Sequence, residues 1–194
     1  MIILIVFLIG AYLLGSISSA VVVCRIAGLG DPRTQGSGNP GTTNVLRLGG
    51  KKLAIFTLLG DMLKGFIPVY LAHFTTLPVP YLSYIGLAAF IGHLFPLFFG
   101  FKGGKGVATA LGVLLALAWP VGFAALVTWV VVAALFRYSS LAALVTAVLL
   151  PLYTYIGSNR AYLPAIILLS LLLIIKHQDN IKRLYSGTES KIKL

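Results

Sequence analysis

The sequence is poor in acidic residues and almost free of cysteine. Four Asp and Glu residues stand against 15 Lys and Arg, which gives a formal net charge of +11. Such a surplus favours anionic partners. Because the basic residues lie in short segments between apolar runs, we expect phosphorylated metabolites and acidic lipid headgroups, and no nucleic acid. Cys24 is the only cysteine, which excludes an intrachain disulfide and any multi-thiolate metal site.

The first apolar run also lacks charge. MIILIVFLIGAYLLGSISSAVVV contains no Lys or Arg, so it has no charged n-region of a signal peptide. We therefore expect residues 1–24 to be retained as a first membrane span. Apolar residues make up 59% of the chain, charged residues 10%, and the mean hydropathy is +1.00. A globule of 194 residues cannot bury that much apolar surface, so an all-α integral membrane protein is predicted.

Apolar runs of roughly the length that crosses a bilayer, about 20 residues, recur along the chain. Five such runs occupy residues 1–24, 53–74, 81–99, 141–157 and 161–175. The sixth, 107–136, would overshoot a core of about 30 Å as one helix at about 1.5 Å per residue, and Trp119-Pro120 interrupts it. We predict two spans hinged at Pro120, of which the piece 107–118 is short. The total is about seven transmembrane helices.

Charge distribution predicts the orientation of these spans. Seven crossings place residues 25–52, 100–106 and 137–140 and the tail 176–194 on one side, with 13 of the 15 basic residues. The positive-inside rule makes that side cytoplasmic, with the N-terminus outside and the C-terminus inside. We expect residues 1–194 to form a single transmembrane domain whose function lies on the inner face.

The first inner segment reads QGSGNPGTTNVLRLGGKK from Gln35 to Lys52. Its glycines let backbone N–H groups approach an anion, and Asn39 before Pro40 predicts an N-cap with proline at N1 of a helix. A dinucleotide site is excluded, since the GxGxxG pattern of this segment needs a preceding strand. A flexible loop with topology anchors would explain its charges but not its amide and hydroxyl groups. Its candidate substrate-binding residues are Gly38, Asn39, Thr42, Thr43 and Asn44.

The second inner segment ends in Lys102, Gly103, Gly104, Lys105 and Gly106. Two lysines among three glycines suit a phosphate, because lysine is a point-charge ligand and glycine exposes backbone donors. The spacing of a Walker A motif is absent, so nucleotide hydrolysis is unsupported. A tight basic turn that merely obeys the positive-inside rule is the alternative.

Other polar candidates lie in the tail and inside a span. His177 and Asn180 are three residues apart, so on a helical continuation they share a face, and His177 suits a general base. Asp61 and Lys64 would each be costly in lipid, so we expect an interior pair with a structural or site-supporting role. His73 and His93 lack a carboxylate at metal-ligand spacing, and no metal site or cofactor is inferred.

Three segments together resemble the bacterial acyl-phosphate:glycerol-3-phosphate acyltransferases, which are small multispan enzymes that begin phospholipid synthesis. They are SGNPGTTNVLR at 37–47, GHLFPLFFGFKGGKGVAT at 92–109 and HQDNIKRLYSGTESK at 177–191. The resemblance implies that Ser37 and Arg47 are essential and that residues 103–106 bind glycerol-3-phosphate. It also implies site roles for His177 and Asn180 and a supporting role for Glu189.

The resemblance implies transfer of an acyl chain from acyl phosphate to glycerol-3-phosphate at the bacterial cytoplasmic (inner) membrane. The His-x4-Asp pattern of other glycerolipid acyltransferases is absent, because Pro78, Phe98 and Lys182 stand five residues beyond the three histidines. An already activated donor needs mainly positioning and oxyanion stabilisation, so no covalent serine intermediate is required. A transporter for a small organic phosphate is the rival hypothesis. Its site would lie near the midplane between repeats, whereas these candidates cluster at one face.

Overall fold

The structure is a computed structural model that describes residues 1–192, so the last two residues of the expected cytoplasmic tail lie outside it. Every regular element among the described residues is helical. The chain divides into two compact units, Met1–Leu117 and Ala118–Leu194. All-α architecture is thereby confirmed for the described residues.

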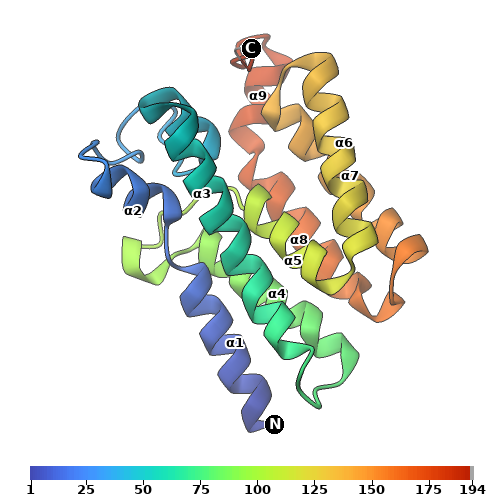
Figure 1. Ribbon diagram of the computed structural model, residues 1–194. Coiled ribbons are helices and arrows are strands. Elements are labelled where there is room, and N and C mark those ends of the chain that lie inside the picture. The colour runs from blue at the N-terminus through green and yellow to red at the C-terminus, as the bar shows by residue number, and fades with distance from the viewer. Residues whose placement is uncertain (193–194) are drawn as a thin grey trace. The chain divides into compact units, whose positions relative to one another are not determined.

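The first unit is built around one long helix. Its elements are α1 (Ile2–Gly15), α2 (Ser19–Ile26), α3 (Thr42–Ala72), α4 (Val79–Leu94), the short 3₁₀ helix η1 (Leu97–Phe99) and α5 (Val107–Leu117). Helix α3 packs against α5, α4, α2 and α1, and α1 also packs along α4 (Figure 1). Glycine allows the closest of these contacts, because a side chain added at Gly112 of α5 would collide with the backbone of Met62 in α3.

The first apolar run does not form one straight span. Helices α1 and α2 meet at an angle of 43° across residues 16–18, so the first span predicted over 1–24 is bent at a break. The physical reason lies in α3, where the Lys64 ammonium donates to the Ile17 carbonyl over 2.7 Å. A backbone group left unpaired at a helix break is costly in lipid, and this side chain satisfies it.

The start of α3 also differs from the prediction. Its N-cap is Gly41, so Asn39 does not cap the helix and Pro40 is not its first residue. The Gly41 N–H donates to the Asn39 carbonyl over 2.9 Å, and Gly41 is extended. Residues 39–41 therefore make a tight turn before the helix begins. A second irregularity lies inside α3 at Gly50, whose φ of +79° marks a kink.

The second unit contains α6 (Trp119–Phe136), α7 (Ser139–Gly157), the 3₁₀ helix η2 (Arg160–Tyr162), α8 (Leu163–Lys176) and α9 (Gln178–Tyr185). Helix α7 packs against both α6 and α8. The predicted break near Pro120 is confirmed, since α5 ends at Leu117 and α6 begins at Trp119 with proline in its first turn. The segment after α8 turns through 55° into α9, with His177 at the bend.

The helix lengths indicate a multi-pass membrane protein. Among the described residues, four helical stretches can cross a bilayer by length and composition, and six can if each bent pair counts as one span. Helix α5 has 11 residues, so at about 1.5 Å per residue it reaches about 16 Å, near half of the hydrocarbon core. Seven crossings and the orientation of the termini remain predictions.

Candidate active site

The segment that carries Ser37 is shaped by the side chain of Asn44. We call residues 30–41 the serine loop. Asn44 is buried in the first turn of α3, and its Oδ1 accepts from the Ser37 N–H over 2.9 Å. Its Nδ2 donates to the carbonyls of Pro32, over 2.8 Å, and Gln35, over 3.0 Å. One amide thus satisfies three backbone groups, and Asn44, which we predicted to bind substrate, holds the loop that presents Ser37.

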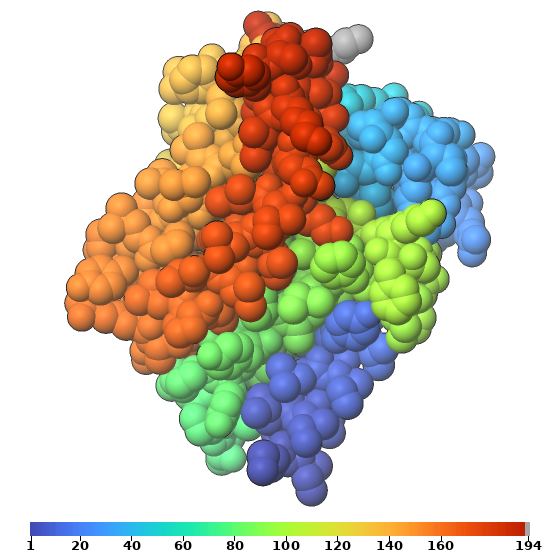
Figure 2. All heavy atoms as spheres, turned by 180° about the vertical axis from the view of Figure 1, so that it is seen from behind, coloured from blue at the N-terminus to red at the C-terminus, as the bar shows by residue number. Residues whose placement is uncertain are grey.

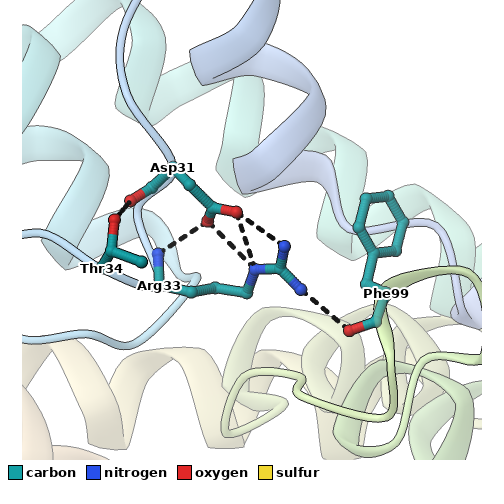
Figure 3. A network of polar contacts seen from close by, with 4 residues as sticks. All are labelled: Asp31, Arg33, Thr34 and Phe99. Carbon is teal, nitrogen blue, oxygen red and sulfur yellow. Dashed lines mark hydrogen bonds and ion pairs between the residues drawn. The ribbon is translucent and has the colours of Figure 1, made fainter.

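Arg33 connects the serine loop to the turn inside the second motif that precedes the glycine-rich residues 100–106 (Figure 3). Its guanidinium makes a forked ion pair with Asp31, with Nη2 at 2.6 Å from Oδ2 and Nε at 3.0 Å from Oδ1. Its Nη1 donates to the Phe99 carbonyl over 2.8 Å, and the guanidinium lies 5.8 Å from the centre of the Phe99 ring. Two segments far apart in the sequence are thereby joined.

The glycine-rich loop, residues 100–106, lies directly against the serine loop and the end of α4. The Gly104 N–H donates to the His93 carbonyl over 3.3 Å. A side chain at Gly104 would collide with the His93 ring and crowd the Pro40 carbonyl. In Figure 2 the light-blue serine loop and the yellow-green turn after α4 lie next to each other. The first two predicted motifs therefore meet within the first unit.

A buried polar group lies beneath this junction. Lys64 Nζ is 2.9 Å from Asp61 Oδ1, and both side chains are less than 5% exposed, so the predicted pairing is confirmed. His93 Nδ1 lies 3.6 Å from the same carboxylate oxygen. Sequence reasoning missed His93, because its carboxylate neighbour comes from another helix. Lys64, Asp61 and His93 thus form a series of polar contacts, and the His93 ring at its end lies against Gly104.

The remaining candidates of the first unit provide hydroxyl groups and cations around the two loops. The Ser37 and Lys102 side chains are exposed, Lys105 is half-buried, and Arg47 is exposed one turn beyond Thr43 in α3. Gly38 has a φ of +70° and continues the turn after Ser37, while Asn39, Thr42 and Thr43 are half-buried. Gly103 and Gly106 complete the glycine-rich loop. Ammonium, guanidinium and hydroxyl groups next to glycine backbone are the donors that phosphate oxygens need.

The third motif forms a hydrogen-bonded cluster within the second unit. Glu189 Oε1 accepts from Asn180 Nδ2 and from Ser140 Oγ, each over 2.6 Å, and its Oε2 accepts from Arg183 Nε over 2.7 Å. Burial raises the pKa of the Glu189 carboxyl, but the hydrogen bonds from Ser140, Arg183 and Asn180 outweigh it and hold the pKa below its ordinary value. An ionised Glu189 thus fixes the amide of Asn180.

His177 is buried at the bend between α8 and α9, and its Nδ1 lies 2.8 Å from the Leu173 carbonyl. A carbonyl can only accept, so we assign the Nδ1 proton to this hydrogen bond, which leaves the lone pair of the neutral ring on Nε2. The His177 carbonyl accepts from the Ile181 N–H over 2.9 Å, which starts the hydrogen bonding of α9. A buried imidazole in this tautomer has the form that a general base requires.

The model of the glycerol-3-phosphate acyltransferase family matches residues 5–187 of the chain. The chain belongs to this family. The glycerol-3-phosphate acyltransferase of Methylococcus capsulatus is 59% identical over 94% of this chain and 92% of its own length. That of Coxiella burnetii is 51% identical over 98% of both chains. The resemblance drawn from the three motifs is confirmed at the level of the family.

Two solved structures are similar to the whole fold. Both are of PlsY (YgiH), described as an integral membrane glycerol 3-phosphate acyltransferase. Its glycerol 3-phosphate form has a TM-score of 0.92 and 40% identity, covering 98% of this chain and 96% of that one. Its lysophosphatidic acid form has a TM-score of 0.90 and 39% identity, covering 98% and 95%. Membership of the family and its apolar helices make this chain a multi-pass bacterial membrane protein.

Proposed function

We propose that the chain transfers an acyl group from an acyl phosphate to the 1-hydroxyl of glycerol-3-phosphate, which gives lysophosphatidate and inorganic phosphate. The observation that carries this proposal is the junction of the serine loop with the glycine-rich loop and its lysines. Both proposed substrates are phosphates, and one has a chain that the bilayer can hold. Membership of the family supports glycerol-3-phosphate as acceptor, and the cationic surroundings of the junction support a phosphorylated donor.

The proposed chemistry is a direct attack without a covalent enzyme intermediate. The 1-hydroxyl oxygen bonds to the carbonyl carbon of the mixed anhydride, the bond to the bridging oxygen breaks, and phosphate leaves. Lys105, residues 103–106 and Arg47 bind phosphate oxygens, while Ser37 and Asn180 orient the donor or the nucleophile. The hydroxyl proton passes to His177 or to the departing phosphate. Because the donor is already activated, orientation and charge stabilisation account for most of the rate.

We further propose that the chain is one domain with seven crossings whose motif segments share the cytoplasmic face of the inner membrane. Within the first unit, the Arg33–Phe99 contact supports a common side for residues 25–52 and 100–106. Within the second, the Ile192 N–H donates to the Arg137 carbonyl over 2.6 Å, which supports a common side for 137–140 and the tail. Labelling of cysteines introduced at positions 102 and 160 of Cys24→Ser protein in inverted vesicles tests the orientation, because only position 102 should then react from outside.

Product formation by detergent-purified protein tests the reaction and the donor together. Labelled glycerol-3-phosphate is supplied with palmitoyl phosphate, and palmitoyl-CoA and palmitoyl-acyl-carrier protein are run in parallel. We expect lysophosphatidate from the acyl phosphate alone. Equal product from a thioester donor would contradict the proposed donor, and no product with any donor, in protein shown to be folded, would contradict acyl transfer.

The role of His177 has its own test. If Nε2 accepts the proton, His177→Ala should slow turnover and remove the acidic limb of the pH–rate profile. A near-normal rate with an unchanged profile would assign proton acceptance to the departing phosphate instead.

A further inference from the structure

Arg33 lies outside the three motifs, yet it bridges the first two of them. The segment around it is fixed on the side of the serine loop, because Asn44 holds the carbonyls of Pro32 and Gln35 on either side. The Arg33 side chain then reaches 66 positions along the chain to the Phe99 carbonyl. The acceptor is a main-chain carbonyl, so any movement of the turn at Phe99 must break or stretch this hydrogen bond.

The Phe99 carbonyl directly precedes the glycine-rich loop. Directly after Phe99, Gly100 and Phe101 both have left-handed backbone, with φ of +64° and +59°, and Lys102 follows. A left-handed conformation is unfavourable for a residue such as phenylalanine, so the turn needs contacts from outside itself. Within the turn, the Phe101 N–H donates to the Pro96 carbonyl over 2.9 Å, and Arg33 supplies a contact from outside the turn.

Asp31 prepares the guanidinium for this contact. It accepts from Nε and Nη2 of Arg33 and also from the Arg33 N–H over 2.9 Å, so the plane of the fork is fixed before Nη1 meets Phe99. The Asp31 backbone carbonyl is in turn held by the Thr34 hydroxyl over 3.0 Å (Figure 3). Only the planar fork of arginine can bind a carboxylate in two places and a carbonyl in a third direction at once.

We propose that Arg33 is a positioning residue that holds the glycine-rich loop in place against the serine loop, so that donor and acceptor phosphates are bound in reacting geometry. The inference rests on the proposed acyl transfer for its kinetic consequence, although the contact itself does not. The rival is that Arg33 binds a substrate phosphate directly with its remaining N–H donors. Positioning and direct phosphate binding predict opposite effects of Asp31→Asn on kcat/KM.

In the positioning role, Arg33 and Asp31 act together as one unit. Arg33→Gln removes the bridge and should lower kcat/KM for glycerol-3-phosphate about tenfold or more, since a charge-assisted bond is lost. Arg33→Lys keeps the charge and loses the fork, and it should show a similar loss. Asp31→Asn should lower kcat/KM in the same direction, and the double variant should be no worse than Arg33→Gln. Arg25→Gln removes an exposed charge that acts on Asp31 only electrostatically, and it serves as the matched control.

Hydrogen exchange of residues 97–106 in the full chain supplies a readout that does not need activity. Arg33→Gln should speed exchange there and leave the exchange of α6 and α7 unchanged. The inference is overturned if Arg33→Gln stays within twofold of Arg25→Gln in kcat/KM, or if exchange of 97–106 is unaltered. It is also overturned in favour of direct phosphate binding if Asp31→Asn raises kcat/KM while Arg33→Gln lowers it. A wild-type chain that makes no product would instead contradict the proposed function, and the exchange result would still decide the positioning role.

Discussion

Removing the amide of Asn44 should release the serine loop without touching any reacting group. In Asn44→Ala, three hydrogen bonds disappear, and the Pro32 carbonyl, the Gln35 carbonyl and the Ser37 N–H lose their partner. At about 1 kcal/mol each the loss is about 3 kcal/mol, which we reduce to about 2 because Gln35 and Ser37 are open to water. If the loop must be ordered in the transition state, about 2 kcal/mol corresponds to an about 30-fold fall in kcat/KM.

The assay is steady-state lysophosphatidate production with both substrates varied, supported by hydrogen exchange of residues 30–41. Asn44→Asp sharpens the test, because a carboxylate can still accept from Ser37 but cannot donate to the two carbonyls, so it should be at least as damaging as alanine. Asn159→Ala, which removes one exposed hydrogen bond to the Ala161 N–H, is the control and should change little. Activity of Asn44→Ala within twofold of this control, with unchanged exchange, would refute the reasoning.

Three further predictions follow from the surroundings of the site. Gly106 has a φ of +85° and faces the Phe90 ring, so Gly106→Ala should abolish most activity, and normal turnover would show that this backbone is dispensable. Asp61→Asn leaves Lys64 buried without its counter-charge and should cost about 3–5 kcal/mol in thermal unfolding in detergent, whereas Asp61→Asn with Lys64→Met should recover only part of it, because the Ile17 carbonyl then loses its donor; equal losses would contradict the pairing argument. The folded pKa of Glu189 is lowered, so its stabilisation is complete above the ordinary value of 4.5 and is lost as pH falls through the folded pKa. The melting temperature of wild type should therefore exceed that of Glu189→Gln at pH 7, and the gap should shrink as the pH falls below 4.5 and vanish once it is below the folded pKa; a gap that stays constant into strong acid would exclude the charge as its cause.

The predictions that held depend on composition and local chemistry. Apolar run length located most of the membrane helices, and Pro120 located the break between α5 and α6, because proline is favoured in the first turn of a helix, where its missing N–H needs no partner. Pro68 and Pro151 lie inside α3 and α7 without ending them, so proline alone does not predict a break. The Asp61–Lys64 pair was predictable for a similar reason, since each charge alone is too costly inside a span and the two are one turn apart.

What sequence reasoning missed depends on which helices pack together. The break in the first run carries no proline, and it exists because Lys64 of α3 offers a donor to Ile17. The contact of His93 with Asp61 requires α3 beside α4, and no spacing within either helix indicates it. Asn44 was predictable as polar and near Ser37, but its three partners are defined only once residues 32–37 fold back over the start of α3.

The basic residues of this chain do more than set its orientation. All four acidic residues are ion-paired in the structure, including Glu189 with Arg183 and the exposed pair of Asp179 and Lys182. Fifteen Lys and Arg therefore outnumber the carboxylates, and two of the paired cations, Lys64 and Arg33, donate to main-chain carbonyls as well.

These carbonyls stand where helices break or turn, and the side chains that meet them are cationic or imidazole groups. The pairs are Lys64 with Ile17, Arg33 with Phe99, His73 with Ala116, and His177 with Leu173. Helix ends and turns leave carbonyls without a partner from the helix, and in lipid nothing else can supply a donor. These four side chains thus permit interrupted helices, and the interruptions in turn make room for glycine-rich backbone and exposed donors beside the bilayer. A chain with the same apolar runs and without these side chains would leave the four carbonyls without their donors, which favours straight helices in lipid.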